Sequence, residues 1–66
     1  MLKNNVREFR KEQGLRQEDF ARELGVSRQT IIAIENGRYY PTLGLALRMA
    51  KFLGVTVEDL FLDAER

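Results

Sequence analysis

Four glycines, taken together with the apolar periodicity, divide this chain into helices of roughly a dozen residues or fewer. Gly14, Gly25, Gly37 and Gly54 each follow an apolar pattern that recurs at helical spacing. Glycine just past a helix end readily takes the left-handed backbone conformation found there. No segment between these glycines alternates apolar and polar residues as a half-buried strand does. The pattern therefore predicts an all-α protein built from short helices.

Capping residues and periodicity place five helices. Ser27, Thr42 and Thr56 are good N-cap residues for the third, fourth and fifth of them. Pro41 separates the third helix from the fourth, because proline does not continue a helix. We expect the first helix at about residues 2–13 and the second at 17–24. The third begins after Ser27, and the fourth ends near Leu53. The fifth contains Val57, Leu60 and Phe61.

The fourth segment is apolar on two sides at about 100° per residue. One side holds Leu43, Ala46, Leu47 and Ala50, and the other holds Leu45, Met49 and Phe52. We expect a central core helix that is buried on both sides, with a second subunit as the alternative for part of the surface. Gly44 inside this helix costs up to about 1 kcal/mol relative to alanine, and a close approach of another helix would explain it.

The length and composition limit the kinds of function. The 66 residues suffice for one domain, and they include no cysteine and no histidine. Disulfides, thiol nucleophiles, imidazole bases and the usual zinc sites are therefore excluded. The longest apolar run is interrupted by Arg48 and Lys51, and the N-terminus lacks the apolar segment of a signal peptide. We expect an intracellular, cytoplasmic protein that is not an enzyme, has no cofactor and binds no membrane or small-molecule ligand.

The charges are distributed unevenly. Residues 1–51 contain ten Lys/Arg and six Asp/Glu, a net charge of +4, whereas residues 52–66 contain one Arg and four Asp/Glu, a net charge of −3. A basic body with an acidic end suits a polyanion that is met on one side. Many proteins without such a partner share this distribution, so it gives weak support.

The turn between the second and third helices is the most specific local feature. The residues "ELGVSR" leave about three positions between two short helices, which forces a steep crossing angle. Ala21 allows the helices to approach, and Val26 can fill the space inside the turn. The pattern predicts a helix-turn-helix unit at about residues 17–36, within a single domain that spans residues 1–66.

The third helix has one face for the core and another for a partner. Ile31 and Ile34 lie on one side at helical spacing, which makes that side the buried one. Arginine and glutamine make paired hydrogen bonds with guanine and adenine edges in the major groove, and apolar groups contact the thymine methyl. The alternative is a solvated face with one stray isoleucine, and the turn favours DNA. The candidate base-contacting residues are Arg28, Gln29, Ile32 and Ala33.

Residues around this helix are suited to phosphate contacts. Gln17 begins the second helix, where free backbone N–H groups and the helix dipole favour an anion. The loop after the third helix is rich in hydrogen-bond donors. Partial packing of at least one tyrosine ring in the core is an equally weighted alternative. The candidate phosphate-contacting residues are Arg16, Gln17, Asn36, Arg38, Tyr39 and Tyr40.

Two opposite charges lie at the border of the apolar faces. Arg10 is beside the apolar side of the first helix, and Glu35 is beside that of the third. We predict an ion pair between them that orients the two helices more than it stabilises the fold. The alternative is two unrelated surface charges.

The stretch "GLRQEDFARELGVSRQTIIAIENGRYYPT", with the ending "LGVTVEDLF", closely resembles the Xre family of phage-repressor and Cro-like helix-turn-helix proteins. The resemblance covers residues 3–62. It implies a five-helix, lambda-repressor-like DNA-binding domain of a dimeric transcription regulator, usually bacterial, archaeal or phage-encoded. Position by position, it supports the roles given above to Gln17, Asn36, Arg28, Gln29, Ala33 and the pair Arg10–Glu35.

This chain departs from the family pattern at two functional positions. Arg16 occupies the usual cap position of the second helix, where a short polar residue is better, so it either reaches a phosphate or costs stability. Ile32 replaces what is often a polar residue, so the family does not supply the operator sequence.

The function that we expect is binding to double-stranded DNA as a small homodimeric repressor. One domain reads too few base pairs for useful specificity, and a dimer on a palindromic operator would correct this. The alternative is a protein-interaction or antitoxin-type module that keeps the fold and uses its apolar C-terminal surface. The candidate dimer-interface residues are Leu45, Met49, Phe52, Phe61 and Leu62.

Overall fold

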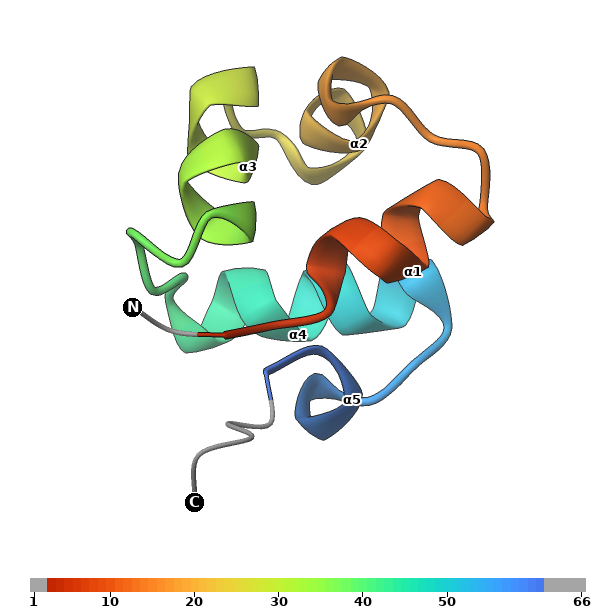
Figure 1. Ribbon diagram of the computed structural model, residues 1–66, viewed down its shortest axis with the longest axis vertical. Coiled ribbons are helices and arrows are strands. Elements are labelled where there is room, and N and C mark those ends of the chain that lie inside the picture. The colour runs from red at the N-terminus through yellow and green to blue at the C-terminus, as the bar shows by residue number, and fades with distance from the viewer. Residues whose placement is uncertain (1–2, 62–66) are drawn as a thin grey trace.

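The computed structural model describes residues 3–61, which fold into five short helices without a strand (Figure 1). In the view of Figure 1, α2 and α3 form the upper part, α1 and α4 cross the middle, and α5 lies below them. The all-α prediction is confirmed. The helices are α1 (Val6–Glu12), α2 (Gln17–Leu24), α3 (Arg28–Glu35), α4 (Leu43–Leu53) and α5 (Val57–Phe61). None of the helices between residues 3 and 61 has the length and apolar character that a bilayer span requires.

The first helix begins four residues later than the sequence predicts. Asn5 is its N-cap residue, and the side-chain oxygen of Asn4 accepts a hydrogen bond from the Val6 amide at 3.1 Å. Asparagine side chains compete in this way with helical hydrogen bonds, which explains the later start.

The three predicted N-caps of α3, α4 and α5 are present. The Ser27 hydroxyl accepts a hydrogen bond from the Thr30 amide at 3.1 Å, and the Thr42 hydroxyl accepts one from the Leu45 amide at 3.2 Å. Thr56 and Asp59 exchange two hydrogen bonds, 2.9 and 3.0 Å long, between side chain and backbone. This reciprocal arrangement is a capping box, and it fixes the start of the shortest helix.

The core draws on every helix. Phe20 and Met49 are fully buried near its centre, and the turn residue Val26 packs against it. Burial of this kind contributes roughly 1.5–3 kcal/mol for each large apolar side chain, which is the main stabilising term in so short a chain. The largest fully buried side chains are Val6, Phe20, Ile31, Ile34, Met49 and Leu60.

The helix α4 buries one face, so the prediction of two buried faces is wrong. Leu43 and Leu47 are 71% and 53% exposed. Leu45 and Met49 are buried inside the monomer at 6% and 0% exposure, which corrects their assignment to a dimer interface. The helices that pack most closely against α4 are α2 and α5, and one broad arc of α4 that contains both residues is buried. The buried residues of α4 are Leu45, Ala46, Met49, Ala50 and Leu53.

Gly44 is not explained by close packing. A Cβ atom at this position would meet no neighbouring atom within 4 Å. The expected close approach of another helix is therefore wrong, and the glycine lies in the exposed first turn of α4.

Side chains from distant parts of the chain hold the ends of three helices. The Asn4 amide donates a hydrogen bond to the Ile34 carbonyl at the end of α3, at 2.9 Å. Gln13 donates to the Leu53 carbonyl at the end of α4, at 2.7 Å. The Arg48 guanidinium donates to the carbonyl of Leu24, at the end of α2, at 3.2 Å. These bonds satisfy carbonyls that a helix leaves without partners, and they fix α2 and α3 against the rest of the fold.

Candidate nucleic-acid interface

The turn between α2 and α3 has the geometry that the sequence predicts. Gly25 has φ of 74° and ends α2 in the left-handed conformation. The Val26 amide then donates to the Ala21 carbonyl at 3.0 Å, which closes the helix end. Ala21 is buried, and Val26 packs against the core. The turn therefore sets the angle at which α3 leaves α2, with the N-terminal end of α3 at the surface.

The outward face of α3 carries the candidate base-contacting residues. Arg28 and Gln29 are exposed in its first turn, whereas Ile32 and Ala33 are half-buried along its side. Ile31 and Ile34 are buried on the opposite side, as expected. This face offers two long polar side chains for hydrogen bonding at one end and apolar groups behind them.

A basic hollow lies where the start of α2 meets the start of α3. Its volume is about 320 Å³. Arg16 is the N-cap residue of α2 and makes no side-chain cap, so the first amides of that helix keep their capacity to bind an anion. The hollow thus brings together candidate phosphate contacts from α2 and a candidate base contact from α3. It is lined by Arg10, Arg16, Gln17, Glu18 and Arg28.

Arg16 is engaged by acidic residues of its own helix. Its Nε donates to Asp19 at 3.0 Å, and its Nη2 lies 3.7 Å from the Glu18 carboxylate. Arg22 donates to the other oxygen of Asp19 at 2.8 Å. The hydrogen bond from Arg16, reinforced by that from Arg22, holds the pKa of Asp19 below its ordinary value. A phosphate at this position would compete with Asp19 for the two guanidinium groups.

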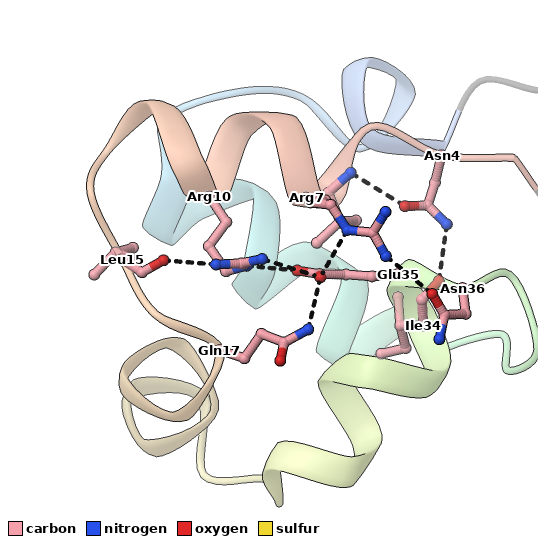
Figure 2. Close-up of polar contacts among 9 residues, drawn as sticks. Asn4, Arg7, Arg10, Leu15, Gln17, Ile34, Glu35 and Asn36 are labelled. Carbon is pink, nitrogen blue, oxygen red and sulfur yellow. Dashed lines mark hydrogen bonds and ion pairs between the residues drawn. The ribbon is translucent and has the colours of Figure 1, made fainter.

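A buried carboxylate joins α1, α2 and α3 (Figure 2). The Glu35 side chain is fully buried and forms two hydrogen bonds with Arg10, at 2.6 and 3.2 Å. The amide of Gln17 donates to the same carboxylate at 3.1 Å. The predicted ion pair is therefore present. The side-chain amide of Gln17 points inward to Glu35, which leaves its backbone N–H as the group best placed for a phosphate.

Arg7 is a member of this network that sequence reasoning missed. Its Nε lies 3.5 Å from the Glu35 carboxylate, and its Nη2 donates to the Asn36 side-chain oxygen at 2.9 Å. The available signal was its spacing, because Arg7 precedes Arg10 by three positions and therefore lies on the same side of α1.

The loop after α3 is exposed at Arg38, Tyr39 and Tyr40. Asn36 is half-buried, Gly37 is buried with φ of 75°, and Arg38 is exposed. Tyr39 and Tyr40 are 45% and 69% exposed, so both rings are partly covered, and neither belongs to the buried core.

The residues expected to form one apolar C-terminal surface lie at two different hollows, Phe52 at one and Phe61 at the other. Phe52 is 40% exposed, with its ring centroid 5.9 Å from that of Phe20, and Phe61 is half-buried. Leu62 lies outside the described residues. The exposed Leu43 is next to a shallow apolar groove of about 290 Å³ between α4 and α5. We call this groove, together with Leu47, the α4–α5 surface; the groove is lined by Tyr40, Pro41, Leu43, Ala46, Val57 and Phe61.

Comparisons with known proteins agree with this geometry. Residues 6–60 match the helix-turn-helix family. The chain is 56% identical, over 92% of both chains, to an uncharacterized HTH-type transcriptional regulator, MJ0272, of Methanocaldococcus jannaschii. It is 37% identical to the cryptic phage CTXphi transcriptional repressor RstR of Vibrio cholerae, over 98% of this chain and 59% of that protein. The crystal structure of a hypothetical transcription factor, NHTF, from Neisseria matches with a TM-score of 0.79 and 36% identity, over 92% of this chain and 70% of that one.

Proposed function

Because the chain belongs to the Xre-like helix-turn-helix family of DNA-binding transcriptional regulators, we propose that it is a homodimeric repressor of a palindromic operator. The observation that carries the proposal is the exposed pair Arg28 and Gln29, which lies beside the basic hollow at the start of α2. Repression, rather than activation, is favoured by the likeness to a phage transcriptional repressor. In this proposal the protein acts on DNA in the cytoplasm.

Helix α3 enters the major groove with its N-terminal end towards the bases. Arg28 and Gln29 then reach base edges, where a guanidinium pairs with guanine and an amide with adenine. Ile32 and Ala33, which are half-buried, offer methyl groups to thymine at the wall of the groove.

The DNA backbone is held on both sides of α3. The first amides of α2, beginning at Gln17, face one phosphate together with Arg16, once that arginine leaves Asp19. The loop after α3 supplies donors to another phosphate through Asn36, Arg38, Tyr39 and Tyr40. Such contacts fix the register of the protein on the duplex, and the base contacts add sequence preference.

A second copy of the chain completes the site. One domain contacts about half of a typical operator, and recognition helices in a two-fold dimer lie roughly 34 Å apart, one turn of the duplex. The α4–α5 surface is the proposed interface, because it combines an apolar groove with two strongly exposed leucines, Leu43 on the groove and Leu47 one helical turn further along α4.

Selection from random duplexes with the purified protein tests this function. We expect a palindromic consensus, and an affinity for random DNA that falls steeply with salt because bound Lys and Arg displace counterions. An affinity that does not depend on salt, or no binding at all, would refute the proposal. That result would favour the protein-interaction or antitoxin-type alternative, in which the α4–α5 surface is the functional one.

A further inference from the structure

Arg7 belongs to α1, outside the helix-turn-helix, yet its side chain ends beside the loop that follows α3. Its Nη2 donates to the Asn36 side-chain oxygen at 2.9 Å, and its Nε lies 3.5 Å from Glu35 (Figure 2). A single guanidinium therefore bridges the buried carboxylate of α3 and the first residue after that helix.

The chemistry of this contact fixes the orientation of the Asn36 amide. A guanidinium has donors and no acceptor, so the group of Asn36 that it holds must be the carbonyl oxygen. The NH₂ group then points away from Arg7, as Figure 2 shows. Phosphate oxygens accept hydrogen bonds, so the NH₂ group is the half of the amide that a DNA backbone requires.

The charges of the network do not cancel. Glu35 supplies one negative charge, which Arg10 already matches with two hydrogen bonds in a buried setting. Arg7 adds a second positive charge, and its side chain is 43% exposed. The excess positive charge therefore lies at the surface beside Asn36, where it favours an approaching anion.

We propose that Arg7 is a positioning residue of the DNA interface, which holds the Asn36 amide with its NH₂ group towards a backbone phosphate. This inference rests on the proposed function, because it requires a phosphate at Asn36. Arg7 acts through Asn36, so its contribution to DNA affinity depends on that residue.

A double-mutant cycle tests this dependence. Affinity for a random duplex is measured at several salt concentrations for the wild type, Arg7→Met, Asn36→Ala and the double variant. We expect each single change to weaken binding about fivefold, the value of one hydrogen bond, and the double variant to be weaker than Asn36→Ala by no more than the loss of one exposed positive charge explains. Losses that multiply in the double variant would mean an independent contact and would overturn the proposal.

Two further variants separate positioning from charge. Lys11→Met removes one positive charge from an exposed position of the same helix, so it is the matched control, and we expect Arg7→Met to weaken binding more. Arg7→Lys keeps the charge but loses the planar group that spans Glu35 and Asn36, so we expect weakened binding with the salt dependence of the wild type. Equal effects of Arg7→Met and Lys11→Met, or wild-type affinity of Arg7→Lys, would overturn the proposal.

The failure of this inference differs from the failure of the proposed function. If the wild type shows no salt-dependent binding to the duplex, the proposed function itself is wrong. If the wild type binds and Arg7 has no coupling to Asn36, the positioning role alone is wrong. Circular dichroism melting of each variant verifies that the affinities refer to folded protein.

Discussion

At the scale of single residues, one carboxylate organises the candidate interface. Glu35 accepts hydrogen bonds from Arg10 of α1 and Gln17 of α2 while it ends α3. The desolvation penalty of burying these charges offsets much of their electrostatic attraction. The network therefore contributes to the orientation of the helices more than to net stability. The three helices around the candidate interface are therefore held at one relative angle.

Gln29 gives the first prediction at this scale. The substitution Gln29→Ala removes an exposed side chain of α3, and we expect it to weaken the selected operator by roughly 1–3 kcal/mol. Binding to random duplex should change little, because a base contact contributes little binding free energy where the matching base is absent. Fluorescence anisotropy titrations of both duplexes measure the difference. An equal loss on both would assign Gln29 to the DNA backbone.

Asp19 gives the second prediction. The substitution Asp19→Asn removes the charge that holds Arg16 and Arg22, at 3.0 and 2.8 Å. We expect tighter binding to random duplex at low salt, and a salt slope steeper by about 0.9 for each arginine that gains a phosphate. Titrations at several salt concentrations measure this slope.

A matched control removes the general effect of charge on that prediction. Glu23→Gln removes one negative charge from an exposed position of the same helix. If both variants steepen the salt slope equally, the specific competition between Asp19 and phosphate does not exist.

The depressed pKa of Asp19 adds a second readout, the dependence of stability on pH. Its stabilising contribution is present above the unfolded pKa of about 4 and is lost as the pH falls through the lower folded value, so Asp19→Asn should lack this part of the acid dependence.

At the scale of helices, capping residues and glycines were sufficient to place α2 to α5 from the sequence. The exposed surface of α4 could not be predicted in the same way. Local signals such as the caps Ser27 and Thr42 act within a few residues, so they are readable without the fold. Leu43 and Leu47 have the same apolar character as the buried Leu45, and which of them is covered depends on where the other helices lie. The contact of Arg7 with Asn36 depends equally on tertiary structure.

The open space at Gly44 gives the prediction for α4. Gly44→Ala adds a methyl group that meets no atom within 4 Å, and alanine loses less backbone entropy in a helix. We expect the free energy of unfolding to rise by up to about 1 kcal/mol, or a few degrees in Tm, measured by thermal denaturation. Gly25→Ala is the contrasting control, because its space is equally open but its φ is +74°, so we expect a loss of stability. A destabilising Gly44→Ala would contradict this account of α4.

At the scale of the whole molecule, the monomer fold leaves apolar side chains exposed on the α4–α5 surface. Leu43 and Leu47 lie one helical turn apart on α4, beside the apolar groove formed with α5. In the proposed dimer this patch couples assembly to specificity, because a second chain there would double the number of base pairs that are read. Dimer formation and operator binding should therefore fail together.

The double substitution Leu43→Gln with Leu47→Gln tests this coupling. Each leucine buried at an interface contributes about 1.5 kcal/mol or more, so we expect the Kd of the dimer to rise at least about 100-fold, measured by analytical ultracentrifugation. Both side chains are exposed in the monomer, so its fold should survive. Binding to a full palindrome should weaken strongly, whereas binding to a single half-site should not. The variant Leu47→Met keeps the apolar surface and should dimerise like the wild type; a dimer that persists in the double variant would place the interface elsewhere.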